Sequence, residues 1–160
     1  NMRLMSGVAK IREMIDLGVP VGLAVDGSAS NDSSNFMREV KMALYLSRTR
    51  MNNSPLTHLD VLWLATRGGA QLLGRDDLGS IEKDKAADII LYKNNTIDFA
   101  GDVHDPVASL IYCGTSDRVD ISIVNGKVVV EDGKLLNIDE EKLKEMVNKE
   151  AKRMMDATNK

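Results

Sequence analysis

One stretch of the sequence, residues 19–34, constrains the fold of this chain more than any other. It begins with an apolar run, residues 19–25, that is long enough for a strand buried on both faces, and the run ends at Asp26. Small polar residues follow it and lead into a predicted helix. In α/β proteins, catalytic groups and ligands lie at the carboxyl ends of parallel strands. The stretch therefore predicts an α/β fold with Asp26 at a functional site.

Amphipathic helices are predicted on both sides of this strand. Ser6 can cap the first, whose apolar residues recur at spacings of three and four, and Gly18 can end it. The second is predicted at about residues 35–50 and has one apolar face. That face contains Phe36, Met37, Val40, Ala43, Leu44 and Ser47, and the candidate caps are Asp32, Ser33 and Ser34. A strand at residues 20–25 between two helices indicates a parallel sheet.

A third helix is predicted to begin after Thr57, which has the capping-box spacing with Asp60. Its apolar residues make it largely buried in this interpretation: Leu59, Leu62, Trp63, Leu64 and Ala65. The pair Gly68-Gly69 is predicted to interrupt it, and Gly74 to end the short helical piece that follows. Two adjacent glycines at such a break indicate a close backbone approach rather than chemistry.

Beyond residue 75 the hydrophobic period becomes that of strands. Strands are predicted at residues 88–92, 109–113, 119–124, 127–131 and 135–136. The pairs Asn125-Gly126 and Asp132-Gly133 are strong signals for tight hairpin turns, so this half is predicted to be mostly antiparallel.

A terminal helix is predicted at about residues 140–157, with Asp139 as its cap. Its apolar residues form a narrow stripe among Glu and Lys: Leu143, Met146, Val147, Ala151 and Met154. Such a stripe is expected to dock on the chain itself or on a second subunit. Because the hydrophobic pattern changes from helical to strand-like and back, we divide the chain into residues 1–75, 76–138 and 139–160.

Charge and composition narrow the range of partners. The net charge is −3, from 21 Lys and Arg against 24 Asp and Glu, with the two signs interspersed. We therefore expect neither nucleic acid nor a membrane as a partner, and no apolar run approaches the ~20 residues of a spanning helix. The single cysteine, Cys113, excludes an internal disulfide and indicates a reducing compartment, so a cytoplasmic protein is predicted. Its apolar strand pattern marks it as a small core residue.

Asp26 is the strongest candidate for chemistry. An Asp-Gly pair is also a common turn, so this acid can simply end a strand. In the functional interpretation, its carboxylate binds a divalent metal through oxygen or accepts a proton from metal-bound water. The hydroxyl and amide side chains of the following loop, among them Ser28, Ser30 and Asn31, can orient such a carboxylate.

The histidines of the chain do not complete a metal site. A mononuclear catalytic zinc site usually takes three protein ligands, often His, and this sequence offers His58 and His104. Neither has a His or Cys at ligand spacing, so both are predicted to be surface residues. The sequence by itself therefore offers one good acid in an incomplete site.

Several strings of the sequence resemble the amidohydrolase superfamily. The likeness is to its aminohydrolase branch of 8-oxoguanine deaminases, hydroxyatrazine hydrolases and cytosine-deaminase-like enzymes. The most specific string is Val-Asp-Gly-Ser-Ala-Ser-Asn-Asp at residues 25–32. Further short matches lie at residues 1–4, 6–7, 18–24, 65–66, 68–70, 73–75, 79–82, 85–88, 105–107 and 124–127. Those at residues 79–82 and 124–127 mark the superfamily more loosely.

The resemblance implies an α/β fold, the C-terminal portion of a TIM-type metal-dependent hydrolase barrel at residues 1–75. Part of a small composite β domain would follow at residues 76–138, and then the terminal helix. The acid that matches Asp26 is, in such enzymes, a ligand of a divalent metal, zinc or iron, and a proton carrier for the attacking metal-bound hydroxide. The implied reaction is hydrolytic deamination of a purine-, pyrimidine- or triazine-like heterocycle, with Ser28 and Asn31 at the substrate.

The same resemblance implies that the site is incomplete, because the His-x-His pair, two further histidines and a second acid of such enzymes have no counterpart here. We therefore expect a C-terminal fragment that is inactive alone, retains no metal and associates into a homo-oligomer. Two alternatives stay open. The same fold could remove chloride or an alkylamine, or the chain could be a structural or interaction module without catalysis.

Overall fold

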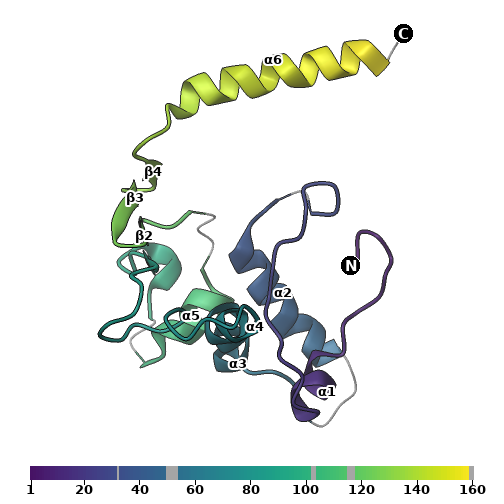
Figure 1. Ribbon diagram of the computed structural model, residues 1–160, viewed down its shortest axis with the longest axis vertical. Helices are drawn as coiled ribbons and strands as arrows, with labels where there is room; N and C mark the ends of the chain where they lie inside the picture. The colour runs from purple at the N-terminus through teal and green to yellow at the C-terminus, as the bar shows by residue number, and fades with distance from the viewer. Residues whose placement is uncertain (32, 50–53, 102–103, 115–117, 159–160) are drawn as a thin grey trace.

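The computed structural model describes residues 1–31, 33–49, 54–101, 104–114 and 118–158 (Figure 1). Within them, four helices precede the first strand of a small sheet, and a fifth helix separates that strand from the other three. One long helix follows the sheet and projects away from the rest (Figure 1). The helices are α1 (Ile11–Asp16), α2 (Phe36–Thr49), α3 (His58–Trp63), α4 (Gly69–Leu72), α5 (Pro106–Tyr112) and α6 (Glu140–Thr158). A π-helical turn, η1 (Leu64–Gly68), joins α3 to α4, and a 3-10 turn, η2 (Ile97–Phe99), precedes α5.

The core lies where α2, α3 and α5 meet. Its buried residues are Val40, Ala43, Leu44, Leu56, Val61, Leu64 and Ile111. The face predicted for α2 is confirmed, since Val40, Ala43, Leu44 and Ser47 are its buried residues. The one polar member is satisfied, because the Ser47 hydroxyl donates to the carbonyl of Leu44 at 2.7 Å and accepts from the amide of Leu56 at 3.1 Å.

Helix α3 begins as predicted but is less buried than predicted. Thr57 and Asp60 form the expected capping box, each side chain accepting a hydrogen bond from the other's backbone amide. Val61 is buried, but the side chains of Leu59 and Trp63 are 58% and 43% exposed. Only one face of the helix packs against α2 and α5, and the prediction of a largely buried helix is therefore wrong.

The glycine pair gives the close backbone approach that the sequence predicts. A Cβ at Gly68 would lie 2.4 Å from the carbonyl oxygen of Val21, and one at Gly22 would lie 3.0 Å from Cα of Gly69. The pair does not interrupt the helix, which continues through η1 into α4. Gly74, at φ +66°, follows this helical piece as expected.

The predicted strand at residues 20–25 is the main difference from expectation. The segment belongs to no sheet among the described residues, and the amide of Leu23 donates to the carbonyl of Leu64 at 3.4 Å. A strand of a parallel sheet forms only where a neighbouring strand supplies the ladder of hydrogen bonds. The predictions of a strand and of a parallel sheet here are therefore wrong, although the segment still leads to Asp26.

The cap predicted for the first helix is also wrong. α1 begins at Ile11, and Ser6 lies in the loop before it, where its amide donates to the carbonyl of Asn1 at 2.9 Å. Gly7, at φ +94°, turns the chain between Ser6 and the helix. Gly18, at φ +74°, ends α1 as predicted, with its amide donating to Ile15.

Asn35, rather than Ser33 or Ser34, caps α2. Its Oδ1 accepts from the amide of Arg38 at 3.1 Å. Ser34 has φ +46°, so the chain is still turning there and the cap falls one residue later. The third predicted cap, Asp32, lies outside the described residues.

The strand predicted at residues 109–113 is a helix in the structure. Asp105 caps α5 by accepting from the amide of Ala108 at 2.8 Å, and Pro106 occupies the first helical position. A short apolar run does not by itself distinguish a strand from a helix, and the Asp-Pro start decides the matter. Cys113 follows the last residue of α5 and is exposed, so its assignment to the core is wrong.

The four strands of the described sheet are antiparallel in the order β1 (Ile89–Leu91), β2 (Ile121–Val124), β3 (Lys127–Glu131) and β4 (Lys134–Leu135). Both predicted hairpins are present. Asn125 and Gly126 have φ of +48° and +76°, and Asp132 and Gly133 have φ of +47° and +72°. These are the positive values that a type I′ turn requires at both central positions.

Helix α6 is capped as predicted, since Asp139 accepts from the amide of Lys142 at 3.0 Å. Its apolar stripe is exposed on the described chain, with Leu143, Met146 and Met154 at 44%, 58% and 65%. Among the residues that the structure describes, no helix combines the length and the apolar character needed to cross a membrane.

Candidate active site

Asp26 ends the 20–25 segment in an unusual backbone conformation. Its φ is +66°, a left-handed value that a residue other than glycine adopts at a cost. The chain then folds into a compact turn, in which the amides of Ser30 and Asn31 donate to the carbonyl of Gly27 at 3.0 Å and 2.9 Å. This turn brings the loop back toward the Asp26 side chain.

Both carboxylate oxygens of Asp26 accept hydrogen bonds from this turn. The Ser30 hydroxyl donates to Oδ2 at 2.6 Å, and the Gly27 amide donates to Oδ1 at 2.7 Å. The Ser30 hydroxyl and then the Gly27 amide hold the pKa of the Asp26 carboxyl below its usual value, because both stabilise the charged form. The side chain is therefore an exposed, ionised carboxylate in a fixed orientation.

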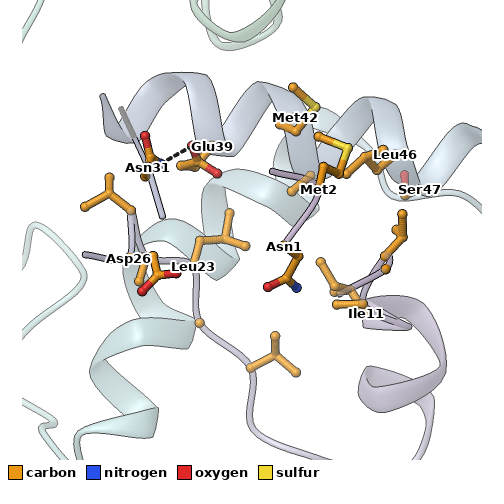
Figure 2. A pocket seen from close by; sticks show the side chains of 18 of the residues that line it. Asn1, Met2, Ile11, Leu23, Asp26, Asn31, Glu39, Met42, Leu46 and Ser47 are labelled. Atoms are coloured by element: carbon orange, nitrogen blue, oxygen red, sulfur yellow. Dashed lines mark hydrogen bonds between the residues drawn. The ribbon is translucent and has the colours of Figure 1, made fainter. Parts of the chain in front are cut away.

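Asp26 lies on the wall of a cavity of about 270 Å³ (Figure 2). The loop before α1, α1 itself, residues 21–26 and α2 form the walls. Apolar side chains contribute much of the lining: Met2, Val8, Ile11, Leu23, Met42 and Leu46. The acids on it are Asp26, Glu13 and Glu39. A pocket that is mainly apolar with a few polar groups is typical of a site for a small organic molecule.

The two residues predicted beside Asp26 differ in their surroundings. Asn31 lines the cavity, and its side-chain amide donates to Glu39 Oε1 of α2 at 2.7 Å (Figure 2). Ser28 is exposed and, among the residues described, is not part of the cavity lining. The structure thus brings Asp26 and Asn31 to one cavity and leaves Ser28 at the outer side of the loop.

The described residues contain no group of three His, Cys, Asp or Glu side chains placed to hold a metal ion. His58 starts α3 and is mostly buried, its side chain 22% exposed, with its Nε2 3.2 Å from Asp105 Oδ2. His104 is exposed, as predicted. Asp26 nevertheless has the chemistry of a metal ligand, an ionised oxygen donor facing a cavity. Asp26 therefore fits a divalent metal as one ligand of a set, and the described residues do not supply the other ligands.

Sequence reasoning missed the specific roles of Ser30 and Glu39. Ser30 was one of several loop hydroxyls, and only the turn at Gly27 shows that its hydroxyl reaches Asp26. Glu39 looks like an ordinary surface acid of an amphipathic helix. Its place in the first turn of α2, directly after the polar loop, is the one signal that could have indicated it.

The comparisons with known proteins all indicate the same family. The profile of the Amidohydrolase family matches residues 1–129. The chain is 45% identical over 139 residues to an 8-oxoguanine deaminase of Pseudomonas aeruginosa, covering 87% of this chain and 30% of that protein. It is 38% identical to a 5-methylthioadenosine/S-adenosylhomocysteine deaminase of Pelotomaculum thermopropionicum, covering 97% of this chain and 36% of that protein.

A solved structure shows the same relationship. The atrazine chlorohydrolase TrzN of Arthrobacter aurescens, complexed with zinc, superposes with a TM-score of 0.84 at 39% identity, covering 94% of this chain and 33% of that one. The chain therefore spans about a third of the length of the proteins that it matches. The similarity confirms the predicted fold class, part of an α/β hydrolase barrel with a small β domain, and the chain belongs to the amidohydrolase family.

Proposed function

We propose that the protein carrying this sequence hydrolytically deaminates a nitrogen heterocycle of the purine, pyrimidine or triazine type, with Asp26 as its acid–base residue. One observation supports this most. The string that most resembles the deaminases, residues 25–32, contains the Asp26 carboxylate, which is ionised, oriented by hydrogen bonds and part of the cavity lining. The hydrogen bonds from Gly27 and Ser30 also suit a structural turn, so it is the place of the carboxylate in the cavity lining that favours chemistry.

Asp26 acts by holding and passing a proton. Its carboxylate accepts a proton from the attacking water and delivers it toward the leaving amine, while Ser30 and Gly27 keep the two oxygens in place. A divalent metal, zinc as in the atrazine chlorohydrolase structure, would supply the Lewis acid and take Asp26 as one ligand. The fragment alone, with one such ligand among its described residues, is proposed to hold no metal and to be inactive.

The size of the cavity suits a small substrate. Its volume of about 270 Å³ is just below the ~300–1,000 Å³ typical of ligand pockets. Ser28 is proposed to contact the substrate from the outer side of the loop, and Asn31 lines the cavity. Removal of chloride or an alkylamine is the second candidate, since one of the similar solved structures is a chlorohydrolase.

We also propose a cytoplasmic homo-oligomer, with residues 1–75 as barrel, 76–138 as β domain and 139–160 as terminal helix. The support for association is the uncovered apolar stripe of α6 and the half-exposed strands. Size-exclusion chromatography with light scattering tests it, and a monomer at all concentrations would contradict it.

A substrate panel tests the proposed reaction. Matched heterocycles carrying an amino, an alkylamino or a chloro group are offered to the complete protein with zinc, and ammonia, alkylamine and chloride are quantified. We expect the highest kcat/KM for the amino substrates. Higher kcat/KM for chlorinated rings would favour the second candidate, and turnover of none of them would favour an interaction module.

A further inference from the structure

We infer that Glu39 is a positioning residue for Asp26 and acts through Asn31. The inference rests on the proposed function only in taking Asp26 as the reacting acid. Its structural part, that the Asn31–Glu39 contact fixes the loop after Asp26, stands independently of any activity.

The contact joins two separate elements. The Nδ2 of Asn31, in the loop after Asp26, donates to Oε1 of Glu39, in the first turn of α2, at 2.7 Å in a partly buried position (Figure 2). Hydrogen bonds to an ionised acceptor are shorter and stronger than neutral ones. This bond therefore ties a polar surface loop to a helix whose inner face lies in the core.

The other end of the Asn31 side chain holds the loop itself. Its Oδ1 accepts from the amides of Ser33 and Ser34 at 3.0 Å and 3.3 Å. The backbone amide of Asn31 donates to Gly27, the residue next to Asp26, at 2.9 Å. Asn31 is thus bonded toward the Asp26 turn, toward the start of α2 and toward Glu39. These contacts favour support of the loop over a direct contact with substrate.

The simplest other role for Glu39 is electrostatic. An acid in the first turn of a helix is stabilised by the positive end of the helix dipole, and Glu39 occupies such a position. The two roles make different demands on the side chain. The dipole requires the negative charge, whereas Asn31 requires an acceptor oxygen, which glutamine also provides.

Amide hydrogen exchange in the 160-residue chain separates these roles. With Glu39→Ala we expect the amides of Ser30 and Asn31 to exchange about tenfold faster, the effect of losing one hydrogen bond to a charged group. With Glu39→Gln, which keeps an acceptor oxygen but not the charge, we expect a clearly smaller acceleration than with Glu39→Ala. The control Glu145→Ala on exposed α6 should leave the exchange rates within about twofold of the original. Unchanged exchange in Glu39→Ala, or equal effects of Ala and Gln, would overturn the inference.

A donor–acceptor exchange gives an independent test. Asn31→Asp places two carboxylates against each other and should accelerate exchange at least as much as Glu39→Ala. Adding Glu39→Gln restores a donor–acceptor pair, because the glutamine amide can donate to one oxygen of the new carboxylate. The other carboxylate oxygen still accepts from the amides of Ser33 and Ser34. Recovery in the double variant is expected, and a double variant no better than Asn31→Asp would contradict the inference.

Kinetics of the complete protein then connect the contact to Asp26. Asn31→Ala and Glu39→Ala should lower kcat at least tenfold with KM within about twofold, and Glu39→Gln should restore kcat. A rise in KM alone would assign Asn31 to substrate binding and overturn the inference. If Asp26→Asn retained full turnover while the exchange results held, the proposed function would fail and the loop contact would remain.

Discussion

The helices around α2 and the sheet with α6 differ in how their apolar residues are covered. Every buried hydrophobic residue in the described part of the chain lies in the helices before the sheet, in α5, or in the turns beside them. The described strands and α6 contain none, and in the sheet Ile90 and Val124 are 52% and 50% exposed. The helical part has a core of its own, whereas the sheet is held by its ladder and its turns.

This difference matters for the site. The loop after Asp26 rests on α2, whose inner face is packed in the core, so its hydrogen bonds start from a supported helix. The sheet and α6 need a further layer to bury their apolar residues. We therefore expect substitutions in the two regions to have unequal effects on the free energy of unfolding.

The largest effect on stability is expected in the helical core. Leu44→Ala should lower the free energy of unfolding by about 3 kcal/mol, since it removes a fully buried side chain and leaves a cavity. Ile123→Ala, at a half-buried position of β2, should cost about 1 kcal/mol. Urea unfolding measures both, and equal losses would show that the two regions are covered alike.

The next effect concerns the close backbone contact between Gly68 and Val21, in the segment that leads to Asp26. Gly68→Ala should destabilise the chain by about 2 kcal/mol, because its Cβ would meet the carbonyl oxygen of Val21 at 2.4 Å. Gly69→Ala is the matched control, with no atom within 4 Å of its Cβ, and should be neutral or stabilising by up to about 1 kcal/mol. Urea unfolding of both variants measures the difference. Equal free energies of unfolding would contradict the close approach of residues 21–22 to the helix.

The two regions also hold their acids by different means. Neutral donors, Ser30 and then Gly27, lower the pKa of Asp26, whereas the Lys93 ammonium lowers the pKa of Asp132 beside the sheet. Salt screens the ion pair more than the neutral hydrogen bonds. In an NMR titration at about 1 M salt, the pKa of Asp132 should therefore rise toward its usual value while that of Asp26 stays low.

Both carboxyls are more acidic folded than unfolded. Their contribution to stability is therefore present above the ordinary aspartate pKa and is lost as the pH falls through the lowered folded value. Ser30→Ala should raise the pKa of Asp26, because the hydroxyl is the main cause of its shift. An unchanged pKa in that variant would remove Ser30 from the site.

The smallest effect is expected on α6. Met146→Ser should change the free energy of unfolding by less than about 0.5 kcal/mol at low protein concentration, because the side chain is 58% exposed. Urea unfolding at low protein concentration measures this change. A loss of free energy of unfolding above about 1 kcal/mol would show that other residues of the same chain cover the apolar stripe.

Local signals in the sequence predicted well wherever the determining residues are neighbours. The type I′ turns at Asn125 and Asp132, the capping box at Thr57 and the inner face of α2 are all of this kind. The segment at residues 20–25 could not be predicted in the same way, since a strand of a parallel sheet depends on neighbours far along a chain. α5 was missed because the apolar run outweighed the Asp-Pro start.

The site divides along the same line. The place of Asp26 at the end of an apolar run was readable from the sequence, as was its potential as an oxygen ligand. Its positive φ, the reach of Ser30 and the bond from Asn31 to Glu39 depend on how the loop turns, and several hydroxyls in that loop are equivalent by residue type.

The most direct test of the proposed function is the turnover of Asp26→Asn in the complete protein carrying this sequence, assayed with its best heterocyclic substrate. The amide keeps the size of the side chain but cannot carry the proton, so we expect kcat to fall by ~1,000-fold or more. Asp156→Asn on exposed α6 is the matched control and should retain full activity. Near-normal turnover by Asp26→Asn would contradict the assignment of Asp26 as the acid–base residue.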